Sequence, residues 1–105
     1  MGKPDEGMKG PGKDLAVERV QTGVRMEKRM VKVLKALAEY LDISLGDLLE
    51  GIVLHAFESK PPFSTQTLQQ IARLKQVYSM DYGIEASHHL TEITPQQKEE
   101  ESDAI

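Results

Sequence analysis

The chain of 105 residues contains no cysteine. Disulfide bonds and thiolate chemistry are therefore excluded, and the composition suits a reducing compartment, so we expect a cytoplasmic protein. No apolar run approaches the roughly 20 residues that a membrane-spanning helix needs, so we expect no membrane partner. The N-terminus also lacks the apolar core of a signal peptide, from which we predict that the protein is not exported.

Sequence motifs for catalysis are missing as well. There is no glycine-rich phosphate loop, no nucleophile beside a base and no pair of carboxylates in a predicted pocket, so we expect neither an enzyme nor a cofactor. His88 and His89 have Asp81 and Glu85 nearby in the sequence, which leaves a small metal-dependent enzyme as the less favoured alternative. Adjacent histidines cannot share one helix face, and no His-x-x-x-His spacing is present, so we assign no metal ligand.

Basic residues are outnumbered in the whole chain, 13 against 17 acidic ones, and the formal net charge is −4. The interval from Arg19 to Lys35 reverses this balance, with one acid, Glu27, against these basic residues: Arg19, Arg25, Lys28, Arg29, Lys32 and Lys35. An acidic total argues against a protein that coats nucleic acid over its whole surface, but it allows binding through a single face. The alternative is an ordinary solvated helix face, and of the two interpretations we favour contact with DNA.

Hydrophobic periodicity predicts one strand followed by helices. Arg19 to Met26 alternates between two faces and contains β-branched residues, which favours a strand, although the interior glycine Gly23 weakens it. The period then becomes helical from about Glu27 to Leu41, and a second helix is expected from a Ser44 cap to about Glu58. Pro61 and Pro62 end that helix.

A third helix is predicted after the two prolines. It is expected from Thr65 to about Asp81, with Ser64 as its cap and Gly83 as its terminator. Residues 84–93 fit either a short fourth helix or an ordered extension. A helix of the length of the third one is marginal in water when isolated, so the apolar side of this third helix must pack on another surface. We expect that side to cover the helical surface opposite the strand, away from any DNA.

The predicted strand has no second strand to pair with in the same chain. A second copy related by a two-fold axis would pair the two strands antiparallel, which predicts a homodimer. Arg19, Gln21 and Arg25 of both copies would then lie on one outward face, at the width of a DNA major groove.

This order of elements resembles the ribbon-helix-helix superfamily of Arc and MetJ type. The resemblance covers about forty residues: the strand at 19–26, the helix at 27–41, the Asp42-Ile43-Ser44 turn and the second helix opening Leu-x-x-Leu-Leu. It implies an intertwined dimer that reads DNA with paired strands. Its base-reading positions fall on Gln21, Gly23 and Arg25, and its phosphate clamp on Ser44, Leu45 and Gly46. Asp42 stands where the family commonly has glycine.

We therefore predict a mainly α, ribbon-helix-helix fold, with one strand and two helices per chain forming an intertwined dimer and a C-terminal helical extension. The expected division is an arm at 1–17, a DNA-binding domain at 18–58, an extension at 59–94 and an acidic tail at 95–105. The predicted function is sequence-specific binding of double-stranded DNA by a repressor-like transcriptional regulator. The base contacts would come from Arg19, Gln21, Gly23 and Arg25, and the phosphate contacts from Lys28, Arg29, Ser44, Leu45 and Gly46.

The alternative function is an antitoxin-like or other protein-interaction module that uses the same dimer. Its supporting feature is the extension at 59–94, which the resemblance does not explain and which could bind a protein partner.

Overall fold

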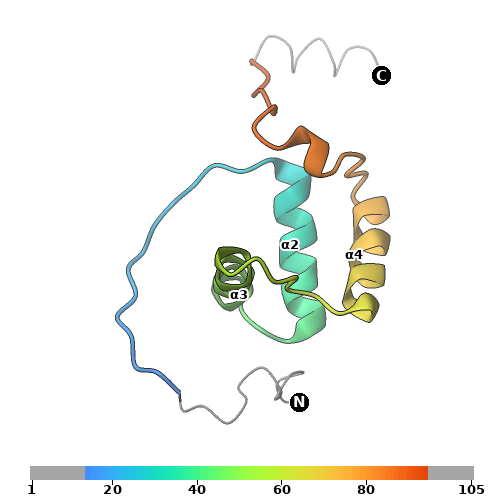
Figure 1. Cartoon of the computed structure of the whole chain (residues 1–105). Helices are drawn as coiled ribbons and strands as arrows, with labels where there is room; N and C mark the ends of the chain where they lie inside the picture. The colour runs from blue at the N-terminus through green and yellow to red at the C-terminus, as the bar shows by residue number, and fades with distance from the viewer. Residues whose placement is uncertain (1–13, 95–105) are drawn as a thin grey trace.

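A computed structural model describes residues 14–94 of the protein. This part contains three α-helices, α2 (Lys28–Leu41), α3 (Leu45–Phe57) and α4 (Thr65–Val77), and one short 3₁₀ helix, η1 (Ile84–Ala86). Helix α2 lies between the other two, with α3 on one side and α4 on another (Figure 1). The predicted tail and the first thirteen residues of the predicted arm lie outside the described residues. Within residues 14–94, no helix has both the length and the apolar character to cross a bilayer.

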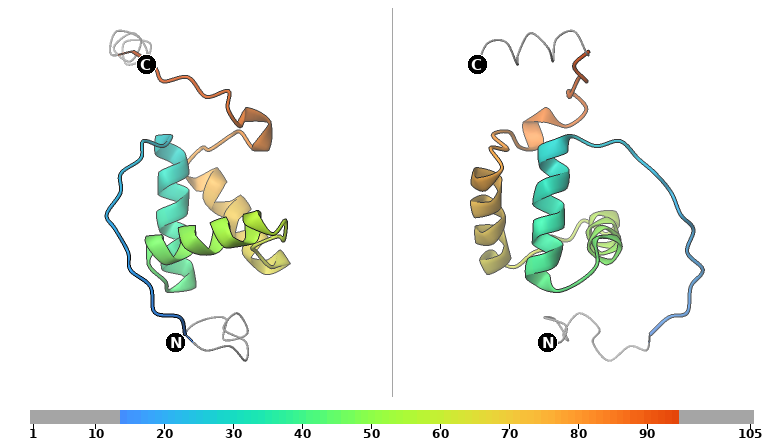
Figure 2. Two further views of the ribbon diagram at one scale, coloured as in Figure 1. Left: turned by 60° about the vertical axis from the view of Figure 1, so that its left-hand side comes forward. Right: turned by 180° about the vertical axis from the view of Figure 1, so that it is seen from behind.

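The predicted ribbon-helix-helix fold is wrong, because residues 14–94 contain no β-strand. Residues 19–26 run extended and exposed from the N-terminal side towards α2 (Figure 2). No backbone hydrogen bond between described residues involves residues 15–26. Alternation sets which side chains share a face, but a strand also needs a neighbouring strand, and the three helices provide no such edge. We call residues 14–26 the N-terminal segment.

The core is small and is built around α2. Leu37, Ala38 and Leu48 are buried in one cluster, against which the following residues pack: Leu34, Leu41, Ile43, Ile52, Phe63, Ile71 and Leu74. Phe63, Ile71 and Leu74 belong to the predicted extension, so the predicted boundary at residue 58 does not divide the structure into two separately packed parts. Helix α4 instead completes the core that α2 begins.

Helix starts follow the capping residues. Ser44 and Ser64 accept hydrogen bonds from Asp47 N and Thr67 N, as the sequence predicts. The predicted first helix begins one residue later than expected, because the carboxylate of Glu27 acts as its N-cap. The third helix ends at Val77 rather than Asp81, because a left-handed residue, Ser79, turns the chain four residues before Gly83.

All three helices end in the same motif, and none uses glycine for it. Asp42, Ser59 and Ser79 adopt the left-handed conformation, with φ of 61°, 58° and 57°. In each case the next residue donates its N–H five residues back, from Ile43 to Ala38, from Lys60 to His55 and from Met80 to Lys75. This is the Schellman arrangement, in which glycine is normally preferred because it lacks a Cβ.

Ser59→Gly should stabilise the protein. A left-handed residue with a Cβ costs about 1–2 kcal/mol, and glycine loses roughly 0.5–1 kcal/mol more backbone entropy on folding, so the expected net gain is about 0.5–1 kcal/mol. Urea unfolding should show a higher midpoint with an unchanged slope. Ser59→Ala keeps the Cβ and is the matched control, for which no gain is expected. A lower midpoint for Ser59→Gly would contradict this explanation.

Candidate nucleic-acid interface

The three arginines of the basic interval are each paired with a carboxylate. Arg19 makes a two-point contact with Glu50 of α3, from Nε to Oε2 at 2.9 Å and from Nη2 to Oε1 at 2.7 Å. This contact raises the pKa of Arg19 and lowers that of Glu50. Arg25 bonds to Glu92, which lies beyond η1. The two contacts attach the N-terminal segment to parts of the chain that are distant in sequence.

The three lysines of the interval are different. Lys28, Lys32 and Lys35 are exposed, and none of them forms an ion pair with a described residue. Their spacing of four and three residues places them on one side of α2. Lys32 lies over the ring of Tyr78, 5.9 Å from its centre, and contacts no carboxylate of a described residue as an ion pair. We call these three residues the lysine face.

The remaining predicted DNA-contacting residues lie on two elements. Gln21 and Gly23 are exposed on the N-terminal segment, with no atom near the position where a Cβ of residue 23 would lie. Ser44 caps α3, and Leu45 and Gly46 form its first turn. Asp47 occupies the same turn, so a carboxylate accompanies the backbone N–H groups that were predicted to hold phosphate.

Arg29, predicted to contact phosphate, is bound within the protein. Its Nε donates to Glu27 at 3.0 Å, and its Nη1 donates to the carbonyl of Ser79 at 3.0 Å and to Asp81 at 3.3 Å. Its guanidinium also lies 5.4 Å from the ring centre of Tyr82. The chain after α4 therefore reaches the N-terminus of α2. The apolar side of α4 packs on the core around α2, whereas the chain after α4 contacts Arg25 and Arg29, two residues that were predicted to contact DNA.

The carboxylate of Glu27 is the centre of this contact. It accepts hydrogen bonds from the backbone N–H groups of Arg29 and Met30, from the Arg29 side chain, and from the hydroxyl of Tyr82 at 2.6 Å. Burial acts to raise the pKa of Glu27, but the hydrogen bonds from Tyr82, Arg29 and Met30 together lower it to about 2. Burial and the bond to Glu27 raise the pKa of Tyr82 to about 12. The pair is therefore a carboxylate and a neutral phenol over the whole physiological range.

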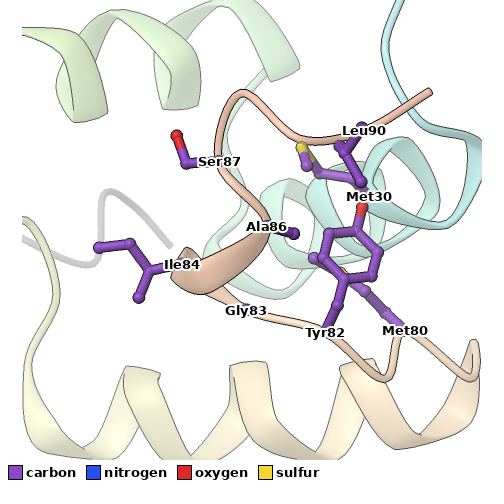
Figure 3. A pocket seen from close by; sticks show the side chains of 8 residues that line it. All are labelled: Met30, Met80, Tyr82, Gly83, Ile84, Ala86, Ser87 and Leu90. Carbon is purple, nitrogen blue, oxygen red and sulfur yellow. The ribbon is translucent and has the colours of Figure 1, made fainter.

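The chain after α4 also forms a hollow of about 360 Å³. Figure 3 shows Tyr82, Met30 and Leu90 together at this hollow, whose other lining residues are Met80, Gly83, Ile84, Ala86 and Ser87. The walls are mostly apolar, and the Tyr82 hydroxyl is already bound to Glu27. The hollow therefore lacks the converging polar groups that orient a substrate.

The two adjacent histidines follow η1 and are exposed. His88 adopts a left-handed conformation with φ of 66°. Within residues 14–94, no group of three or more potential metal-ligating side chains comes together.

Sequence patterns did not reveal the carboxylates that hold the arginines. Glu50 is 31 residues from Arg19, and Glu92 is 67 residues from Arg25. Tyr82 is 55 residues from Glu27. The one available local signal was the position of Glu27 directly before the first helical period, but glutamate is not among the preferred N-cap residues.

Comparison of the chain with protein-family models, with curated proteins and with solved structures found no match.

Tyr82→Phe should destabilise the protein, because it removes a hydrogen bond to an ionised group. The expected loss at pH 7 is about 1–2 kcal/mol in the free energy of unfolding. Because the pKa of Glu27 is depressed in the folded state, its contribution is complete above the unfolded value of 4.5 and is lost as pH falls towards about 2. In the variant, the pKa of Glu27 should be higher, so the stabilisation of the fold by the ionised Glu27 should disappear at a higher pH than in the unchanged protein.

Urea unfolding between pH 2 and pH 7, together with an NMR titration of the Glu27 carboxyl, measures both effects. Tyr40→Phe removes the hydroxyl of a 45% exposed tyrosine on α2 and is the matched control. Equal effects of the two variants would show that the bond between Tyr82 and Glu27 does not stabilise the fold.

Proposed function

We propose that the protein binds double-stranded DNA with sequence preference, as a homodimer, and acts as a repressor-like regulator of transcription in the cytoplasm. The observation that carries this proposal is the lysine face. In a chain with a net charge of −4, the arginines of the basic interval are neutralised internally, whereas Lys28, Lys32 and Lys35 remain exposed and form no ion pair with a described residue. Such a concentrated positive face is typical of proteins that contact phosphates with one side.

Contacts to bases would come from the N-terminal segment. Arg19, Gln21 and Arg25 are exposed there, and arginine and glutamine can bond to base edges through two parallel hydrogen bonds. Gly23 would allow the backbone to approach closely. Both arginine pairs are solvent-exposed, and exposed ion pairs contribute little to stability, so DNA can displace Glu50 and Glu92. Arg29 would act indirectly, by fixing the start of α2.

Replacing Lys28 and Lys35 together by alanine should weaken binding to all duplex sequences similarly. For every phosphate that the variant no longer neutralises, the slope of log affinity against log salt should become shallower by about 0.9. Fluorescence anisotropy with a labelled duplex at 50 to 200 mM salt gives both quantities. Lys32 is left unchanged because it packs on Tyr78.

Lys60→Ala combined with Arg73→Ala is the matched control. Both residues are exposed cations outside the lysine face, and the change in net charge is the same. If the two double variants lose equal affinity, the lysine face is not the DNA surface. Selection of bound sequences from a random duplex pool would then test sequence preference, which depends on Arg25 and Gln21.

The homodimer is supported by apolar side chains that the described chain leaves uncovered. On α3, Leu54 and Phe57 are 63% and 79% exposed, and on the N-terminal segment Val20 and Val24 are 81% and 74% exposed. Exposed apolar side chains of this size are typical of surfaces that a protein partner covers. These surfaces also favour the second candidate function, a module that binds a different protein, and the oligomeric state separates the two.

Leu54→Glu should convert the dimer to monomer. Sedimentation at micromolar concentration should give about twice 11.7 kDa for the unchanged protein and about 11.7 kDa for the variant. Leu68→Glu, at a position on α4 with 52% exposure, is the matched control and should remain dimeric. A folded monomer for the unchanged protein would exclude the homodimer and favour a different protein partner.

A further inference from the structure

We propose that the chain after α4 regulates DNA binding through Glu92, which occupies the guanidinium of Arg25 until DNA displaces it. This inference rests on the proposed function and assigns a role to residues 79–92. It follows from the observation that one carboxylate on this segment already holds an arginine that would otherwise face a base or phosphate.

The segment is held at its beginning. The Ser79 carbonyl and Asp81 bind Arg29, and the Tyr82 hydroxyl binds Glu27, so residues 79–82 are fixed against the N-terminus of α2. Glu92 follows ten residues after Tyr82 and returns to Arg25, two residues before Glu27. The anchor therefore keeps Glu92 near Arg25 whether or not their ion pair is formed.

A tether of this length makes the competition intramolecular. The ten residues from 83 to 92 include η1, and even a fully flexible tether of ten residues spans only roughly 16–19 Å in root-mean-square terms. Short tethers of this kind give effective concentrations in the millimolar range. Glu92 therefore competes with DNA for Arg25 at a local concentration that does not depend on the concentration of the protein.

The pair is weak enough to be exchanged. The side chains of Arg25 and Glu92 are 84% and 69% exposed, so solvent screens their attraction, and the contact resembles other exposed pairs that contribute little. A DNA duplex presents a row of phosphates and engages several cations at once, whereas Glu92 offers one charge. DNA therefore wins this exchange at a modest loss of affinity.

Glu92 differs in this respect from the other arginine partner. Glu50 lies within α3, so the helix fixes its backbone beside Arg19. Glu92 lies beyond η1 in a segment without helix or strand, and this segment can move away from Arg25 while Tyr82 stays bound. Competition through Glu92 can therefore be adjusted without disturbing the helical core.

The test is a double-mutant cycle on the full chain with Glu92→Gln and Arg25→Ala. Glu92→Gln alone should bind duplex DNA about two- to fivefold more tightly at 50 mM salt, which corresponds to the contribution of an exposed ion pair. The gain should shrink at 200 mM salt because the pair is screened. In the Arg25→Ala background, Glu92→Gln should bring no gain, since its partner is already absent.

Glu58→Gln is the matched control for net charge, because Glu58 is exposed and forms no ion pair with a described residue. If Glu92→Gln gains no more than Glu58→Gln, or keeps its gain without Arg25, the inference is overturned while DNA binding stands. If no variant binds duplex DNA at 50 mM salt, the proposed function itself fails. The Arg25 Nε–H resonance, measured without DNA, should shift in Glu92→Gln and not in Glu58→Gln, which tests the pair independently.

Discussion

The arrangement of the protein depends on the carboxylate of Glu27 at the start of α2. It accepts two backbone N–H groups of the helix, the side chain of Arg29 and the hydroxyl of Tyr82. Three parts of the chain meet at this one side chain: the incoming N-terminal segment, the first turn of α2 and the chain after α4. Because the site is half-buried and fully hydrogen-bonded, the ionised form is favoured although burial opposes it.

The arginines and the lysines of the basic interval have different partners in the structure. The guanidinium groups attach the chain internally at Glu27, Glu50 and Glu92, and that of Arg19 does so through two parallel hydrogen bonds. The ammonium groups of the lysine face form no such contact with the described residues. This difference agrees with the chemistry of the two side chains. The planar guanidinium of arginine donates hydrogen bonds in fixed directions and suits a fixed carboxylate, whereas the ammonium of lysine is a point charge on a flexible chain.

Local features were predictable from the sequence, and features that join distant parts of the chain were not. Ser44 and Ser64 cap the helices next to them in sequence, so short-range patterns sufficed to predict them. The alternation of the N-terminal segment gave its extended form but not a strand, because pairing requires a partner that alternation cannot supply. The contact between Tyr82 and Glu27 joins residues far apart in sequence, and no spacing rule connects them.

The candidate site was predictable to a similar extent. The concentration of basic residues was visible in the sequence, and the helical spacing of the lysines followed directly from the period of the predicted helix. The pairing of the arginines with carboxylates was not predictable, because it depends on acidic residues in α3 and beyond η1.

The order of the helices has a consequence for folding kinetics. Helix α3 follows α2 after three residues, and α4 follows α3 after seven, so the core forms from contacts that are short in sequence and assemble quickly. The contacts of Ser79 and Tyr82 with the start of α2 close loops of 50 and 55 residues, and that of Glu92 with the N-terminal segment closes a loop of 67 residues, so all three form more slowly. During synthesis, Arg25 therefore leaves the ribosome long before the carboxylate that neutralises it. A newly made chain passes through a stage with its helices folded and this arginine still free.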